Sequence, residues 1–229
     1  MKLTPRLMKI AEMVPLSDSM ADIGTDHAYL PIFLLEQEKI RRAVACDIHK
    51  GPLLRAASNI ADRGMNGLIT LRLGSGFETL RSGEVNGAVI AGMGGLMMID
   101  ILKKSPVVSS SFQWMILQPQ NHVAELKKYI CEHYFQIVKE CLVEEANQLY
   151  EIMKIVPGKS SMITLFEAEI GVTNDYRRDP LFAKHIGKLI KKRDFLINGI
   201  ASDTDNDINR RKREKAMNEK KELEELIWQ

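Results

Sequence analysis

Apolar residues in the first 120 positions fall into short, nearly continuous runs that alternate with amphipathic stretches. Such runs are typical of parallel strands buried on both faces, whereas a half-exposed strand alternates apolar and polar positions. The amphipathic stretches have the spacing of helices. The pattern predicts strands near residues 20–23, 42–46, 69–73, 87–91 and 114–118, with helices near 29–38, 51–63, 95–103 and 122–132.

Further elements flank this alternating pattern. Thr4 and Pro5 are typical of a helix start, and the helix they begin should stop before Pro15. Apolar runs at 135–144 and 149–156 surround a short polar turn and predict an antiparallel hairpin. The sequence therefore predicts an α/β fold with a Rossmann-like sheet of five parallel strands plus an antiparallel hairpin. This is the sheet of class I methyltransferases, in contrast to the all-parallel sheet of nicotinamide dehydrogenases.

The pattern changes after residues 157–161, which have the composition of a boundary. This segment contains Gly-Lys-Ser, but a P-loop needs a glycine at the position of Met153, so we exclude a nucleoside triphosphate site. We expect a methyltransferase domain at 1–160 and a helical domain at 161–229.

Apolar positions beyond Glu169 recur at intervals of three and four, which predicts long helices. A turn and N-cap at 203–207 should divide them into two antiparallel helices in a coiled-coil hairpin. The apolar stripes are short, so we expect the hairpin to dock on something else. The apolar stripes of the two helices consist of Phe182, Ile186, Leu189, Leu196, Ile200, Ala216, Leu223, Leu226 and Ile227, and Arg193 interrupts the first stripe.

Of the 229 residues, 45% are hydrophobic and 27% charged, as in ordinary soluble globular proteins. There is no apolar run of about 18 residues and no signal-peptide core, so we expect a cytoplasmic protein with no membrane partner. Cys46, Cys131 and Cys141 are unevenly spaced and should be reduced. No spacing of His, Cys and Asp indicates a metal site, and no protein partner is implied.

The segment from Asp22 to Pro31 joins the first predicted strand to a helix through a tight acidic turn. Gly24 lets the backbone turn where a Cβ would obstruct it, and the helix after His27 presents free N–H groups. A dinucleotide fingerprint needs a glycine two positions after Gly24, but Asp26 stands there, and it repels a pyrophosphate and attracts a cation. S-adenosylmethionine carries an ammonium and a sulfonium, so the turn favours this cofactor.

Three further predicted strands also end in small or acidic residues. Asp47 ends the second strand about 20 residues past the glycine turn, where Rossmann-like folds place an acceptor for ribose hydroxyls. Ligands of open α/β sheets bind outside the carboxyl ends of the strands, so we expect the loops to share one crevice. The candidates on these loops are Asp47, Ile48, Gly74, Ser75, Gly76, Gly92, Met93 and Gly94.

The net charge of +2 conceals basic clusters near the carboxyl end. Seven basic residues and one acid lie between residues 177 and 193, and five bases and one acid lie between 210 and 215. A solvated helix face is the ordinary explanation of such a run, and contact with a polyanion is the alternative. The candidates for nucleic-acid contact are Arg177, Arg178, Lys184, Lys188, Lys191, Lys192 and Arg193.

Five motifs cover the whole predicted catalytic part: Leu3-Thr4-Pro5-Arg6-Leu7, Asp22-Ile23-Gly24-Thr25-Asp26-His27-Ala28-Tyr29-Leu30-Pro31, Ala45-Cys46-Asp47-Ile48, Ile90-Ala91-Gly92-Met93-Gly94-Gly95 and Leu117-Gln118-Pro119-Gln120. Together they resemble the bacterial tRNA (adenine-22 N1)-methyltransferases, which pair a Rossmann-like domain with a carboxyl-terminal helical hairpin. The resemblance implies methyl transfer from S-adenosylmethionine to N1 of adenine 22 in tRNA. The tail matches in kind and length more than in motif.

The resemblance also implies roles for single residues. Gly24 and Thr25 shape the turn under the methionine part of the cofactor, Asp22 and Asp26 lie near its ammonium, Asp47 binds the ribose, Ser75 and Gly76 border the adenine, and Gly92, Met93 and Gly94 form the floor under the methyl group. His27, Ile48 and Gly74 belong to the same cofactor-binding set. Asp26 is a candidate to stabilise the cationic product, and Tyr29 either stacks on the flipped target base or forms a wall. The acceptor for the target amine is either the glycine segment or the stretch Gln118, Pro119 and Gln120.

Two other functions are compatible with the sequence. A methyltransferase for a small molecule would use the same loops, but it would leave the basic tail without a partner. A non-catalytic RNA-binding relative would keep the tail, but the intact acidic and glycine loops argue against it.

Overall fold

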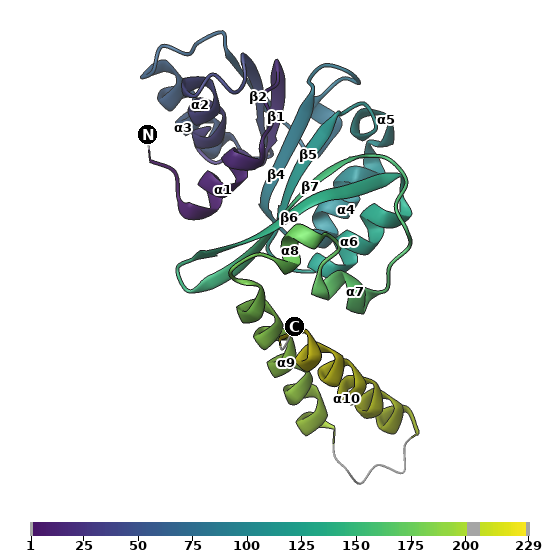
Figure 1. The fold of residues 1–229 in the computed structure, drawn as a ribbon. Helices are drawn as coiled ribbons and strands as arrows, with labels where there is room; N and C mark the ends of the chain where they lie inside the picture. Colours follow the sequence, from purple (N-terminus) through teal and green to yellow (C-terminus); the bar gives the residue numbers. More distant parts are fainter. Residues whose placement is uncertain (1, 201–206, 228–229) are drawn as a thin grey trace.

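The computed structural model describes residues 2–200 and 207–227. At its centre is a seven-stranded sheet in the order β3-β2-β1-β4-β5-β7-β6 (Figure 1). β1 to β5 are parallel, and β7 pairs antiparallel with both β5 and β6. The predicted fold class is confirmed. The strands are β1 (Ser19–Ile23), β2 (Arg42–Asp47), β3 (Ile69–Leu73), β4 (Gly87–Met93), β5 (Trp114–Pro119), β6 (Phe135–Glu145) and β7 (Gln148–Pro157).

Helices cover both faces of the sheet. One apolar cluster packs α1 (Pro5–Met13), α2 (Tyr29–Glu36) and α3 (Lys50–Ala61) on one face. The other packs α4 (Gly95–Lys104) and α6 (Val123–Glu132) on the opposite face. These helices were predicted, whereas η1 (Gly76–Thr79) and α5 (Pro106–Ser109) were not, because four residues are too few to establish a period.

The chain order reverses beside β1, and this reversal positions the site. β1 pairs with β2 on one side and with β4 on the other, so that Ile23 lies between Cys46 and Ile90. In doubly wound sheets, ligands bind at such a switch point, outside the carboxyl ends of the strands. The loops after β1, β2 and β4 therefore meet at one edge.

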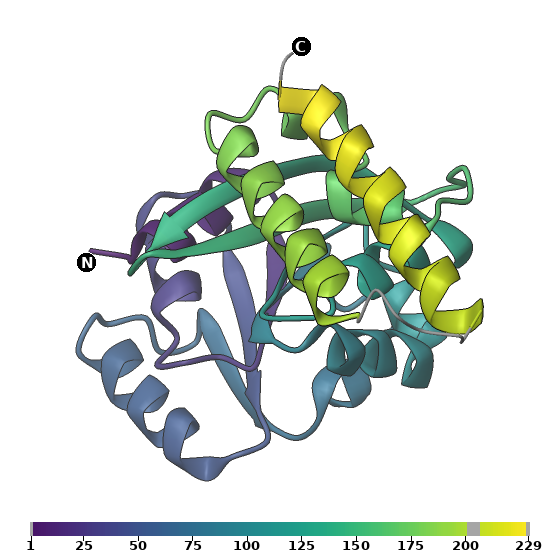
Figure 2. The same ribbon diagram turned by 90° about the horizontal axis from the view of Figure 1, so that it is seen from below.

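The carboxyl-terminal part begins with two short helices that the sequence did not predict, α7 (Leu165–Ile170) and α8 (Asn174–Arg177). The long helices α9 (Phe182–Gly199) and α10 (Asp207–Ile227) then run side by side, away from the sheet (Figures 1 and 2). A small apolar cluster joins Leu142 of β6 to Tyr176, Ile186 and Leu223. Leu196, farther along the predicted stripe, is 44% exposed. The predicted turn at 203–206 lies outside the described residues.

A buried charged layer lies between α6, the β6–β7 hairpin and α8. Lys127 is fully buried, and its Nζ lies 2.7 Å from Glu140 Oε1 and 2.8 Å from Glu151 Oε2. The Tyr176 hydroxyl donates to Glu151 Oε2 at 2.7 Å, and the backbone N–H groups of residues 172 and 173 donate to Glu140 Oε2. Ionic contacts therefore link the sheet to the beginning of the tail.

Three expectations concern features that the described part of the chain lacks. No helix in the described ranges is long and apolar enough to cross a membrane. All three cysteines are buried and unpaired. Within the same ranges, no group of three His, Cys, Asp or Glu side chains is arranged to hold a metal ion.

Candidate cofactor and substrate site

The turn after β1 is held against the end of β2. The N–H groups of Gly24 and Thr25 both donate to the Cys46 carbonyl, at 2.8 and 2.9 Å. Gly24 has a φ of +74°, and a Cβ at this position would lie 2.3 Å from Cε of Met93. Glycine suits this point because the conformation is left-handed, and any other side chain would also have to displace the end of the flexible Met93 side chain.

Asp22 is the buried acid of this turn. It is 7% exposed and accepts a hydrogen bond from Thr25 Oγ1 at 2.6 Å. Burial raises the pKa of Asp22 from the ordinary 3.8 to about 6, with contributions from Asp26 and Asp47, while the Thr25 hydrogen bond opposes the rise. A cationic ligand beside Asp22 would lower this pKa again, because an opposite charge favours the ionised carboxylate.

Asp47 ends β2 on the neighbouring loop. Its Oδ1 accepts from the His49 N–H at 2.7 Å, which fixes the side chain, and its backbone carbonyl accepts from the Gly74 N–H at 3.0 Å. No donor among the described residues contacts Oδ2. The carboxylate therefore retains one oxygen for a ligand.

The cofactor candidates from different strands line one cavity of about 270 Å³. Seven predicted residues contribute: Gly24, Asp47, Ile48, Gly74, Ser75, Gly76 and Met93. The structure adds residues that the sequence analysis missed, among them Phe77, Glu78, Met97, Asp100, Ile101 and Lys104. Those from α4 recur at helical spacing, which was the available signal. An apolar cavity rimmed by carboxylates suits a nucleoside that carries a cationic side chain.

A second cavity of about 290 Å³ adjoins the first, and Gly24 lines both. Asp22, Asp26, Tyr29 and Gly92 of the predicted set line the second cavity. Tyr29 is 37% exposed, and its ring stacks on His27 at a centroid distance of 5.1 Å. Asp26 has an 82% exposed side chain with Oδ1 3.1 Å from His27 Nε2. The cavity thus offers an aromatic face and a carboxylate beside the cofactor cavity.

Of the two candidate acceptors for the target amine, the stretch at 118–120 contributes only Gln120 to the cavity linings, and Gln118 and Pro119 line neither cavity. Gln118 is fully buried, and its Oε1 accepts from Arg6 Nη1 at 2.6 Å and from the Gly92 N–H at 3.1 Å. Its Nε2 donates to the Pro119 carbonyl at 2.8 Å. Gln118 therefore holds the cavity wall in place, whereas Gln120 reaches the cavity surface.

Arg6 is a site residue that sequence reasoning did not select. It lines the second cavity, its backbone N–H donates to Glu145 Oε2 at 2.8 Å, and its guanidinium lies over the Tyr150 ring. Glu145 is at the tip of the β6–β7 hairpin. The signal was weak, since an arginine in the first turn of a helix has no distinctive chemistry.

Three of the predicted cofactor-binding residues lie outside the lining of both cavities: Thr25, His27 and Gly94. Thr25 supports Asp22, and the His27 carbonyl accepts from Asn59 Nδ2 at 2.9 Å. Within the glycine segment, Gly95 leaves no room for a side chain, because a Cβ there would lie 2.4 Å from the His122 carbonyl oxygen.

The basic tail residues fall into different environments. Arg177, Arg178, Lys188 and Lys191 are exposed. Lys184 Nζ donates to Glu144 Oε1, and Lys192 Nζ donates to Glu169 Oε1, each at 2.6 Å. Both lysines remain about half exposed.

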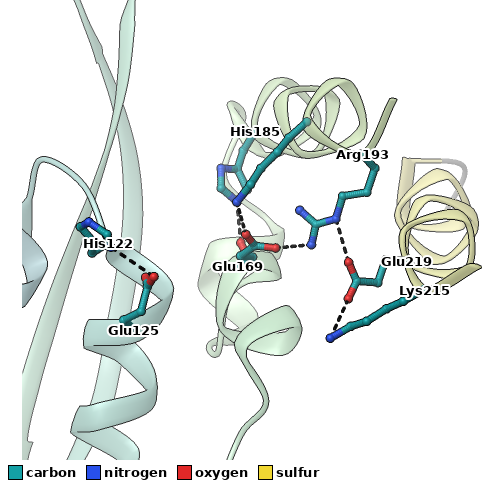
Figure 3. A network of polar contacts seen from close by, with 8 residues as sticks. His122, Glu125, Glu169, His185, Arg193, Lys215 and Glu219 are labelled. Atoms are coloured by element: carbon teal, nitrogen blue, oxygen red, sulfur yellow. Dashed lines mark hydrogen bonds and ion pairs between the residues drawn. The ribbon is translucent and has the colours of Figure 1, made fainter. Parts of the chain in front are cut away.

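Arg193 differs from the other basic candidates. It is 4% exposed and pairs with Glu169 of α7 and Glu219 of α10 (Figure 3). The structure therefore gives Arg193 a contact within the protein in place of the predicted contact with nucleic acid. This also explains its place within the apolar stripe of α9.

The fold and the two adjoining cavities have counterparts among known proteins. Residues 3–153 match a family described as "Methyltransferase domain", so the chain is a member of the methyltransferases. The chain is 34% identical over 158 residues to the tRNA (adenine(22)-N(1))-methyltransferase of Bacillus subtilis, an alignment that covers 69% of this chain and 66% of that protein, just under two thirds of its length.

Solved structures extend the similarity to the whole chain. The crystal structure of the B. subtilis m1A22 tRNA methyltransferase TrmK superposes with a TM-score of 0.88 at 28% identity and covers 99% of each chain. M. capricolum TrmK, solved in complex with S-adenosyl-homocysteine, gives a TM-score of 0.82 at 27% identity and covers 98% of this chain and 97% of that one. By its methyltransferase domain the chain belongs to the methyltransferases, and over its whole length it is similar to the solved structures of TrmK.

Proposed function

We propose that this chain transfers a methyl group from S-adenosylmethionine to N1 of adenine 22 in tRNA. The observation that carries the proposal is the pair of cavities that share Gly24, one lined by the cofactor loops and the other by Tyr29 and Asp26. Methyl transfer needs the donor sulfur and the acceptor nitrogen in line, so the two ligands must occupy adjoining sites that exclude water.

S-adenosylmethionine, when bound, would supply a sulfonium-bound methyl group that could be transferred to the unpaired N1 of adenine, with the thioether sulfur as the leaving group. The chain's residues orient and shield this displacement. Asp22 pairs with the cofactor ammonium, Asp47 holds the ribose, and Gly24 lets the two ligands approach. Tyr29 stacks on the extruded base, and Asp26 offsets the positive charge that the adenine ring acquires.

The tail completes the site in this proposal. Residues 161–229 form the tRNA-binding domain and residues 1–160 the catalytic domain. Exposed basic side chains on and beside α8 and α9 contact the tRNA phosphates. They are Arg177, Arg178, Lys184, Lys188, Lys191 and Lys192.

The test is methylation of a set of undermodified tRNAs with labelled cofactor, followed by nucleoside mapping. N1-methyladenosine at position 22 is the expected product. Labelling of small molecules alone would favour the small-molecule alternative, and binding of tRNA without methylation would favour a non-catalytic relative.

We expect Asp47→Ala to weaken cofactor binding by roughly 1.5 to 3 kcal/mol, the contribution of hydrogen bonds to a charged acceptor. Calorimetric titration with S-adenosylmethionine measures the change. Asp62→Ala is the matched control, because Asp62 is an exposed acid at the end of α3. Equal affinities of the two variants would remove Asp47 from the site.

The raised pKa of Asp22 predicts two pH dependences with opposite signs. The native carboxyl holds its proton more tightly than the unfolded one, so the stability of the ligand-free protein should fall by roughly 3 kcal/mol as pH rises from about 4 to above 6. Binding of the cofactor ammonium requires the carboxylate, so cofactor affinity should fall as pH drops below about 6. Thermal denaturation and titration calorimetry across this range measure both, and Asp22→Asn should abolish both. Dependences that persist in Asp22→Asn would assign them to another group.

A further inference from the structure

One face of α9 combines positive charge with an exposed aromatic ring. Lys184, Lys188, Lys191 and Phe195 recur at intervals of four, three and four, which places them on the same side of a helix. All four are exposed. Phe195 is 79% exposed, which makes it the most exposed aromatic side chain in the described part of the chain. We call this set the lysine–phenylalanine face.

This face begins next to the proposed substrate cavity. Lys184 Nζ donates to Glu144 at the tip of the β6–β7 hairpin, and the adjacent Glu145 accepts from the Arg6 N–H, which belongs to the cavity. From Lys184 the face continues for eleven residues, about 17 Å along the helix axis. Figure 1 shows α9 leading away from the sheet in this direction. A polyanion that enters the cavity can therefore extend along α9.

We propose that Phe195 stacks on an unpaired base of the RNA whose phosphates lie along the three lysines. The inference rests on the proposed function and deepens it, since it names the contact farthest along α9 from the cavity. Lysines beside an exposed aromatic ring are the combination that binds single-stranded nucleic acid, because phosphates take the charges and a base takes the ring. A second copy of this chain docked through the same face would set lysine against lysine, so the charge favours RNA.

The test uses the full chain and an unmodified tRNA transcript. Phe195→Ala should raise the dissociation constant about 5- to 150-fold, the range of one lost base stack. The salt dependence of binding should keep its slope, because no phosphate contact is lost. Phe195→Trp should bind about as tightly as the wild type, and tRNA should quench the emission of the new tryptophan. Leu16→Ala is the control, since Leu16 is 81% exposed and precedes the amino end of β1, opposite the carboxyl ends of the strands where the cavities lie.

The outcomes separate this inference from the proposed function. Wild-type protein that methylates tRNA while Phe195→Ala binds it with unchanged affinity would overturn the stacking contact alone. A Phe195→Ala variant that binds tRNA like the wild type but has a different oligomeric state in solution would also overturn it, because the ring would then contact another protein copy. A wild type that neither binds nor methylates tRNA would overturn both.

Discussion

We expect Lys127→Met to lower the free energy of unfolding by about 3 to 5 kcal/mol, the range seen when one partner of a buried ion pair is removed. Lys127 is fully buried between Glu140 and Glu151. Burial alone would lower the pKa of Lys127, but Glu151 and Glu140 outweigh it and raise the pKa, so the side chain stays charged. Without it, two carboxylates would face each other in the interior. Chemical denaturation measures the loss.

The neighbouring lysine provides the matched control. Lys128 pairs with Glu132 on the surface of α6, and Lys128→Met should change stability by no more than about 1 kcal/mol. Replacing both acids as well, in Lys127→Met with Glu140→Gln and Glu151→Gln, should restore much of the lost stability. Cofactor affinity of the folded protein should change little, because the residues that line the cofactor cavity all precede position 106. Equal losses in the two single lysine variants would contradict the ionic explanation.

The second large effect should follow from replacing Lys184, Lys188 and Lys191 together with alanine. Each phosphate contact contributes about 0.7 to 0.9 to the slope of log affinity against log salt, so the slope should fall by about 2 to 3. Binding of an unmodified tRNA transcript between about 50 and 200 mM salt measures it. Methylation at physiological salt should drop with the affinity, whereas cofactor binding should not change.

The control for this variant replaces exposed basic residues in another part of the protein. Arg41 and Arg42 lie at the start of β2, at the edge of the sheet away from the cofactor loops. Their replacement by alanine should leave the slope unchanged. If the two variants have the same slope, the α9 lysines are a solvated surface.

The sheet and the cofactor loops could be predicted because their signals are local. Each of the first four parallel strands is an apolar run that ends beside a glycine or an acid, so Gly24 and Asp47 were identified by their position at strand ends. The edge at which those ends meet then follows from the topology of open α/β sheets. No contact between distant residues had to be known.

The second cavity depends on contacts that local patterns do not contain. Arg6 is positioned by Glu145, which lies 139 residues away in the sequence. The resemblance made Gln118 one of the alternative candidates at the target base, but its oxygen accepts from Arg6 and from the Gly92 N–H. A strand end shows that a side chain is near the site, and only the packing shows which way it faces.

Arg193 illustrates the same limit for charge. It was grouped with the other basic residues of its run although it interrupts the apolar stripe, because the acids that pair with it come from α7 and α10, distant in the sequence. Composition therefore identified the basic helix correctly, but it could not separate the exposed members from the one that holds the helices together.

The shared position of Gly24 also bears on inhibitor design. The Met93 methyl lies where a side chain of Gly24 would be, at the point where the two cavities adjoin, and a methionine side chain rotates readily. A single compound that joins a cofactor-like nucleoside to an adenine-like arm would pass close to Gly24 and this methyl group. Linking the two halves makes the second binding event intramolecular, so such a bisubstrate ligand gains affinity without any new contact.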